Sequence, residues 1–219
     1  MKKEEVLKKV YECGVVPVVR ASTADEAMRV VEAIREGGVA VLEITMTVPR
    51  AVLVIERVAD AYGDSVVVGA GTVLDAETAR ECMLAGAQFV VSPALDAGTV
   101  ECCRRHGVAV MPGALTPTEV VSAWRAGADV VKVFPCGAVG GAKYLKSLKA
   151  PLPQIELMPT GGVSLSTAAG FIEAGAFALG VGADLVDTKA IREGRPEAVS
   201  DAARAYVEAV RAARAASSD

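Results

Sequence analysis

A lysine and a glutamate each stand inside a short apolar run, where charged side chains are rare. Lys132 lies in Val130-Val-Lys-Val-Phe-Pro, and Glu43 lies in Val41-Leu-Glu-Ile-Thr. Burial disfavours the ammonium form of a lysine, and the neutral amine is the form that attacks a carbonyl carbon to make a Schiff base. We therefore predict that Lys132 is a nucleophile and that Glu43 is its acid/base partner. A structural ion pair is the alternative, although packed apolar residues often stabilise a fold equally well.

Two further polar residues end apolar runs. Arg20 ends Pro17-Val-Val-Arg, and Thr72 ends Gly69-Ala-Gly-Thr. A guanidinium fork and a hydroxyl at one edge of a sheet could hold a substrate carboxylate. A surface ion pair for Arg20 and a turn hydroxyl for Thr72 stay open as alternatives.

Glycine-rich turns follow two other apolar runs. Thr160-Gly-Gly and Gly180-Val-Gly offer backbone N–H groups that no side chain covers. Such groups, together with the N-terminus of a following helix, often bind phosphate. The two turns therefore predict an anion site, and tight turns alone are the alternative.

Eight short β-branched runs alternate with amphipathic stretches and must position these residues. The alternation predicts an α/β protein, a (β/α)8 TIM barrel forming a single domain over residues 1–219, with an extra helix from Met1 to Cys13 across its bottom. A doubly wound open sheet is the alternative. The predicted strands are Val15–Arg20, Ala40–Thr45, Val66–Val73, Phe89–Pro93, Ala109–Gly113, Val130–Pro135, Glu156–Gly161 and Phe177–Gly182, and the helices between and after them are Ser22–Arg35, Pro49–Ala61, Ala76–Ala85, Ala97–His106, Pro117–Ala126, Gly141–Lys149, Ser164–Ala174 and Pro196–Ala213.

Composition argues against several classes of function. The chain has 23 basic and 27 acidic residues without a basic block, so we expect no nucleic-acid partner. The acidic N-terminal segment and the absence of a long apolar run predict no signal peptide and no membrane span, and hence a cytoplasmic protein. Five cysteines without CxxC spacing predict reduced thiols and no zinc site. His106, the one histidine, falls at a predicted helix end, which argues against a Ser-His or Cys-His triad.

Seven motifs, taken in chain order, resemble the family of 2-keto-3-deoxy-6-phosphogluconate (KDPG) and 4-hydroxy-2-oxoglutarate (KHG) aldolases. They are Pro17-Val-Val-Arg, Leu42-Glu-Ile-Thr, Val68-Gly-Ala-Gly-Thr-Val, Val91-Ser-Pro, Met111-Pro-Gly-Ala-Leu-Thr-Pro-Thr-Glu, Lys132-Val-Phe-Pro and Pro159-Thr-Gly-Gly-Val. The resemblance implies a class I aldolase that splits KDPG into pyruvate and glyceraldehyde 3-phosphate, or KHG into pyruvate and glyoxylate. It also implies a small keto-acid substrate, no metal or organic cofactor, and a homotrimer.

The resemblance assigns roles to single residues of this sequence. It makes Lys132 the Schiff-base lysine and Glu43 the acid/base. It places the pyruvate carboxylate on Arg20 and Thr72. The other residues expected to bind substrate are Pro93, Phe134, Thr160, Gly161, Gly162 and Gly182.

The sequence departs from the family pattern at two places. Thr47 stands where some members carry an arginine, which leaves Arg20 as the expected carboxylate anchor. Ala183, followed by Asp184, stands where many members have a serine that helps bind phosphate. Related substrates therefore stay open, such as the galactonate analogue of KDPG or an unphosphorylated sugar acid. An isomerase or epimerase, and a non-catalytic barrel that binds a sugar acid, are the alternatives outside the aldolases.

Overall fold

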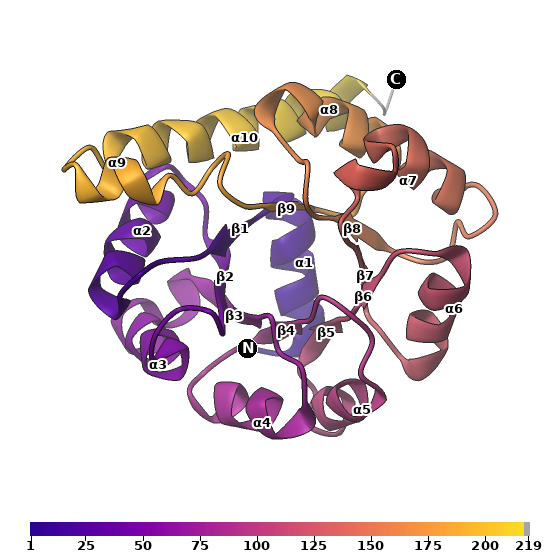
Figure 1. The fold of residues 1–219 in the computed structure, drawn as a ribbon, viewed down its shortest axis with the longest axis horizontal. Helices are drawn as coiled ribbons and strands as arrows, with labels where there is room; N and C mark the ends of the chain where they lie inside the picture. Colours follow the sequence, from indigo (N-terminus) through magenta and orange to yellow (C-terminus); the bar gives the residue numbers. More distant parts are fainter. Residues whose placement is uncertain (217–219) are drawn as a thin grey trace.

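The strands form parallel sheets that curl into a ring, with helices on the outer side (Figure 1). The computed structural model describes residues 1–216. One sheet has the order β5-β4-β3-β2-β1-β9, and the other has the order β6-β7-β8. The strands are β1 (Val15–Val19), β2 (Val41–Thr45), β3 (Val67–Gly71), β4 (Phe89–Val91), β5 (Ala109–Met111), β6 (Gly113–Ala114), β7 (Val131–Val133), β8 (Leu157–Pro159) and β9 (Leu179–Val181).

The predicted parallel α/β architecture is confirmed, while closure into one eight-stranded barrel stays a prediction. The predicted strand Ala109–Gly113 was wrong as a single strand, because Pro112 has no N–H to donate and divides it. β5 pairs with β4, and β6 pairs with β7. An isolated bridge between Thr160 and Gly180 links the end of β8 to β9.

The helices follow the predicted pattern, and their ends differ from it by a few residues. The left-handed backbone of Gly38, Gly86 and Gly175 ends three of the helical segments, as expected of glycine. The short helix α9 was missed, since five residues carry too little periodicity to detect. The helices are α1 (Lys3–Cys13), α2 (Ala24–Glu36), α3 (Ala51–Tyr62), α4 (Ala76–Leu84), α5 (Ala97–Arg105), α6 (Pro117–Ala126), α7 (Gly141–Lys149), α8 (Leu165–Glu173), α9 (Thr188–Arg192) and α10 (Glu197–Ala216), with 3-10 turns η1 (Gly63–Ser65) and η2 (Gly137–Val139).

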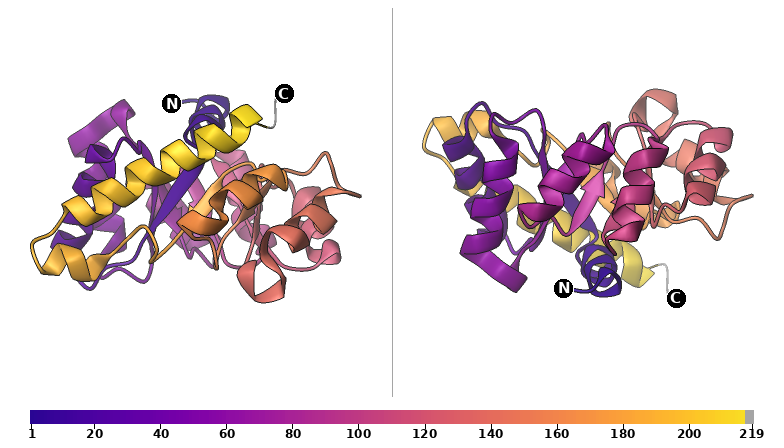
Figure 2. Two further views of the ribbon diagram at one scale, coloured as in Figure 1. Left: turned by 90° about the horizontal axis from the view of Figure 1, so that it is seen from above. Right: turned by 90° about the horizontal axis from the view of Figure 1, so that it is seen from below.

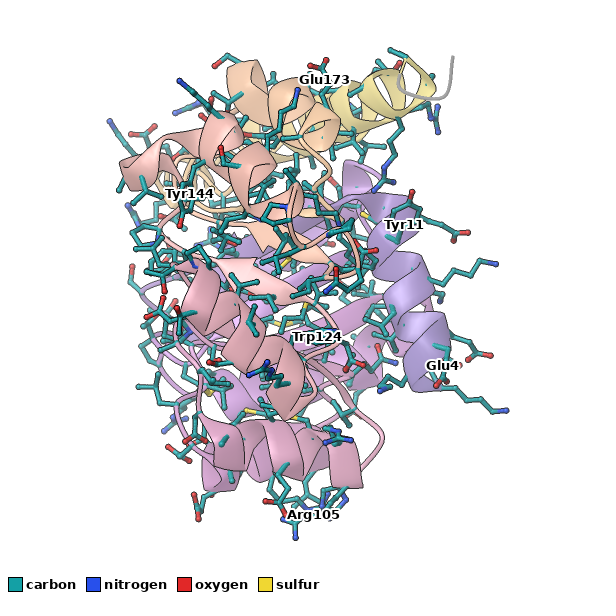
Figure 3. The ribbon with its side chains drawn as sticks, turned by 90° about the vertical axis from the view of Figure 1, so that its right-hand side faces the viewer. Glu4, Tyr11, Arg105, Trp124, Tyr144 and Glu173 are labelled. Carbon is teal, nitrogen blue, oxygen red and sulfur yellow. The ribbon has the colours of Figure 1, made fainter. Side chains whose placement is uncertain are left out.

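Buried side chains form two layers, one between the strands and the outer helices and one inside the curl of the strands. In the inner layer Val6 and Val10 of α1 pack with strand residues such as Phe89 and Met111. Figure 2 shows α1 at one end of the strands, beside the end of α10, where the Arg214 guanidinium donates to the Tyr11 carbonyl. Side chains fill the space between helices and strands (Figure 3).

No helix within residues 1–216 is long and apolar enough to cross a membrane.

Candidate functional site

The structure brings Lys132 and Glu43 together, although they lie 89 positions apart in the sequence. Lys132 is the middle residue of β7 and Glu43 the middle residue of β2. The Lys132 Nζ lies 3.9 Å from Glu43 Oε1, and the two residues are only 4% and 1% exposed. Neither carboxyl oxygen of Glu43 has a hydrogen-bond partner among residues 1–216. A buried carboxyl group without hydrogen bonds is costly, which points to a role beyond stability.

The surroundings of Glu43 favour its protonated form. Burial raises the pKa of the Glu43 carboxyl, and the positive charges of Lys132 and Arg20 oppose that rise. The net direction is upward, so the proton stays on Glu43 at higher pH than on an exposed glutamate. The Lys132 Nζ also lies 5.4 Å from the ring centre of Phe134, as expected for a residue that lines the lysine.

Two glycines allow close backbone approach around this pair. A Cβ on Gly71 of β3 would lie 2.6 Å from Glu43 Oε1, so any larger residue would displace the carboxyl group. Gly113 of β6 pairs with Lys132, and a Cβ there would lie 2.2 Å from the Pro93 carbonyl oxygen. Both strands therefore approach the site closely because glycine occupies these positions.

Arg20 and Thr72 flank the end of β2. β1 and β3 pair with opposite sides of β2, and Arg20 and Thr72 follow β1 and β3 directly. The predicted strand ends at both residues were one or two positions too long. Thr72 has a φ of 60°, which is unusual for a threonine and typical of strained backbone at functional sites. Arg20 is exposed and makes no hydrogen bond or ion pair with another residue of 1–216.

A cleft of about 360 Å³ holds both glycine-rich turns. Thr160, Gly161, Gly162 and Gly182 all line it, so these four predicted residues lie together. Gly161 and Gly162 have φ values of 80° and 79°, which only glycine adopts readily. The buried Thr160 hydroxyl has no hydrogen-bond partner among the described residues. The remaining lining residues are Val18, Arg20, Phe134, Val163, Ala183 and Asp184.

Pro93 and Thr72 do not line this cleft. Pro93 lines a neighbouring cavity of about 440 Å³, which shares the Phe134 ring with the cleft. Thr72 lines neither cavity. Phe134 thus stands between two hollows at the carboxyl ends of the strands, close to Lys132.

The first backbone N–H of α8 already has a partner on the turn that follows β9. The Leu165 N–H, the first of α8, donates to Asp184 Oδ1 at 3.1 Å. Asp184 Oδ1 also accepts from the buried Tyr206 hydroxyl at 2.5 Å. Asp184 stands out in the sequence as a departure from the family pattern, whereas Tyr206 has no local signal beyond its place on an amphipathic helix.

The histidine, the cysteines and the acidic side chains of residues 1–216 are the residue types that bind metals or supply thiols. No group of three or more His, Cys, Asp or Glu residues is close enough there to hold a metal ion. The five cysteines are free thiols. Burial raises the pKa of Cys82 and Cys136 to about 11, so their reactive thiolate forms are rare at neutral pH.

Residues 5–202 match the family described as KDPG and KHG aldolase. The chain belongs to this family. The KDPG and KHG aldolases are carbon–carbon lyases.

Known relatives extend over most of the chain. A 2-dehydro-3-deoxy-6-phosphogalactonate aldolase of Escherichia coli (strain K12) is 35% identical over 196 residues, 89% of this chain and 95% of the relative. A KDPG aldolase from Legionella pneumophila, solved with pyruvate captured as a covalent carbinolamine intermediate, is 25% identical with a TM-score of 0.83 and covers 92% of this chain and 97% of its own. A designed cube-shaped protein cage, made by fusing symmetric oligomeric domains, is 35% identical with a TM-score of 0.85 and covers 94% and 74% of the two chains.

Proposed function

We propose that this protein is a class I aldolase that cleaves KDPG to pyruvate and glyceraldehyde 3-phosphate through a Schiff base on Lys132. The observation that carries the proposal is the buried pair itself. Lys132 Nζ lies 3.9 Å from a glutamate whose carboxyl oxygens bond to nothing else among residues 1–216. A substrate carbonyl beside Lys132 would come within reach of both groups.

The reaction uses this pair at each proton transfer. The neutral Lys132 amine adds to the substrate keto carbon, and Glu43 moves the protons that turn the adduct into an iminium with loss of water. The iminium withdraws electrons as the C3–C4 bond breaks, and Glu43 accepts the proton of the C4 hydroxyl. The resulting enamine is protonated at C3, and hydrolysis then releases pyruvate and the free lysine. Because its pKa is raised, the Glu43 carboxyl can donate a proton at a higher pH than an exposed glutamate can, and its ionised form can accept one.

The flanking residues place the two ends of the substrate. The substrate carboxylate binds near the end of β2, between Arg20 and Thr72. The far end extends along the cleft toward Gly161, Gly162 and Gly182. Arg20 supports both ends, because its charge acts on Glu43 and its side chain also lines that cleft. The unpartnered Thr160 hydroxyl is available to a substrate oxygen between them.

The galactonate analogue of KDPG is the second candidate substrate. It is favoured by the relative that acts on 2-dehydro-3-deoxy-6-phosphogalactonate and matches 89% of this chain. The two substrates differ only in the configuration at C4, which is the atom that carries the hydroxyl deprotonated by Glu43.

A panel of three substrates tests the proposal. Pyruvate release would be measured with KDPG, its galactonate epimer and unphosphorylated 2-keto-3-deoxygluconate. We expect KDPG to have the highest kcat/KM. A higher value for the epimer would assign the second candidate, and no pyruvate from any of the three would contradict the proposed function.

We also propose that the fold is one closed (β/α)8 barrel over the whole chain, with α1 as an added helix at its amino end. Support comes from the short break at Pro112 between β5 and β6 and from the Thr160–Gly180 bridge between β8 and β9. We propose a homotrimer as its assembly, with support from the likeness to a cage built of symmetric oligomeric domains. Sedimentation at about three times the chain mass of 22.5 kDa tests this, and a monomer would contradict it.

A further inference from the structure

One carboxylate ties together three separate parts of the chain at the far end of the cleft. Asp184 follows β9 and lines the cleft with Gly161, Gly162 and Gly182. Its Oδ1 accepts from the Leu165 N–H at the start of α8 and from the Tyr206 hydroxyl of α10. The link therefore runs from the wall of the cleft to a helix on the outside of the protein, which packs along α8 (Figure 1).

This link spans both turns that face the substrate's far end. Leu165 comes three residues after Gly162, and Asp184 comes two residues after Gly182. The Asp184–Leu165 hydrogen bond thus fixes the two turns relative to each other. Gly162 has a further constraint, because a Cβ there would lie 2.7 Å from the Gly137 Cα. The backbone donors of the two turns therefore have a spacing that depends on where Asp184 is held.

Tyr206 is the group that holds Asp184 from the outside. Its side chain is 1% exposed, and its hydroxyl donates to Asp184 at 2.5 Å. Burial, followed by the Asp184 hydrogen bond, raises the pKa of Tyr206 strongly, so the hydroxyl stays a donor over the working pH range. A buried hydroxyl is costly without a hydrogen-bond partner, and Asp184 is the partner of the Tyr206 hydroxyl.

We propose that Tyr206, acting through Asp184, is a positioning residue that sets the spacing of the two glycine turns and so controls recognition of the substrate's phosphate end. The inference rests on the proposed function, because it assigns the far end of the cleft to a phosphate. Tyr206 touches no substrate in this account. Its effect is on the KM of phosphorylated substrates and not on the chemistry at Lys132.

Tyr206→Phe removes the hydroxyl and keeps the ring, which isolates the link. We expect the KM for KDPG to rise by about 5- to 10-fold, which corresponds to the net contribution of one ordinary hydrogen bond. The kcat for KDPG, and the kcat/KM for 2-keto-3-deoxygluconate, should each stay within about twofold. Ser200→Ala is the matched control, since it removes another buried hydroxyl of α10 that donates only to the Glu197 carbonyl. Ser200→Ala should leave the KM and kcat for KDPG and the kcat/KM for 2-keto-3-deoxygluconate unchanged.

Asp184→Asn separates geometry from charge. The amide oxygen can still accept from Leu165 and Tyr206, while the negative charge beside the phosphate is removed. We expect this variant to lower the KM for KDPG by about two- to threefold, because a partly exposed like charge repels the phosphate weakly. If the KM of Asp184→Asn for KDPG rises as much as that of Tyr206→Phe, the two hydrogen bonds of Asp184 do not position the turns and the inference is overturned.

The remaining outcomes are also decisive. An unchanged KM for KDPG in Tyr206→Phe would overturn the inference. So would an equal decrease in kcat/KM for KDPG and for 2-keto-3-deoxygluconate. A wild-type protein without preference for phosphate would overturn it as well. Failure of the proposed function looks different, since the wild-type protein would then form no covalent adduct between pyruvate and Lys132.

Discussion

Replacing Glu43 by glutamine is expected to remove turnover while the fold survives. The change keeps the shape of the side chain and one hydrogen-bonding oxygen, and it removes the charge and the transferable proton. If Glu43 carries the protons of the reaction, kcat should fall by about 10²- to 10⁴-fold, which is the usual contribution of a positioned acid or base.

The structure also predicts that stability will change little. At 3.9 Å and an effective dielectric constant of about 20, the attraction of a Lys132–Glu43 ion pair is roughly 4 kcal/mol. Burying the two charges costs several kcal/mol for each ion, so the attraction does not offset the loss of hydration. Glu43 also accepts no hydrogen bond among residues 1–216, and burial dominates the shift in its pKa. At a pH below the raised pKa, where Glu43 is already uncharged, we therefore expect the free energy of unfolding to change by less than about 1 kcal/mol.

Glu26→Gln is the matched control at a second buried glutamate. Glu26 is 2% exposed and has the partners that Glu43 lacks, with Arg192 Nη1 at 2.7 Å from Oε1 and the Ser22 N–H at 2.7 Å from Oε2. It lies outside the cleft, so its variant should lose stability and keep its turnover. Steady-state pyruvate release and thermal unfolding would be measured on both variants. Near-normal turnover of Glu43→Gln, with a stability loss of about 3 kcal/mol, would refute the acid/base role.

Three further results are expected. Gly71→Ala should lower kcat by about 10-fold or more, because its Cβ would lie 2.6 Å from Glu43 Oε1. Gly170→Ala is the control and should keep its kcat, since its Cβ would meet only Ala142 at 3.7 Å. Equal kcat values for the two variants would contradict the idea that Gly71 leaves room for the Glu43 carboxyl group. Because the pKa of Glu43 is raised, the folded protein keeps a proton that the unfolded chain has lost. The free energy of unfolding should therefore fall as pH rises from the ordinary glutamate pKa to the raised one. Thermal unfolding of Glu43→Gln should lack this dependence on pH. KDPG should exceed its unphosphorylated analogue in kcat/KM by at least about 10-fold, or about 1.4 kcal/mol, and equal values would favour an unphosphorylated substrate.

The buried pair of Lys132 and Glu43 could be predicted from sequence because a charged residue inside an apolar strand is a strong local signal. Lys132 and Glu43 each contradict the pattern of their own strand, and side-chain alternation puts each on the same face as an inner-layer residue, Val130 for Lys132 and Val41 for Glu43. The glycine turns could be predicted for a similar reason, since Gly161 and Gly162 adopt backbone that few other residues tolerate.

Features that depend on tertiary contacts could not be predicted in this way. The link from Tyr206 to Asp184 and Leu165 joins parts of the chain that carry no shared sequence pattern. The division of a strand at Pro112 could have been foreseen, because proline lacks the donor that a continuous strand uses. Thr72 was placed inside a strand because its unusual φ has no marker in the sequence.

The central claim is a covalent bond between Lys132 and the substrate, and reduction with borohydride in the presence of pyruvate tests it most directly. Borohydride converts an imine into a stable amine, so the adduct survives digestion and mass spectrometry can locate it. We predict loss of activity together with a pyruvate-derived mass increase on Lys132, and no increase without pyruvate or in Lys132→Arg. An unmodified protein, or an adduct on Lys143 or Lys146 instead, would contradict the account.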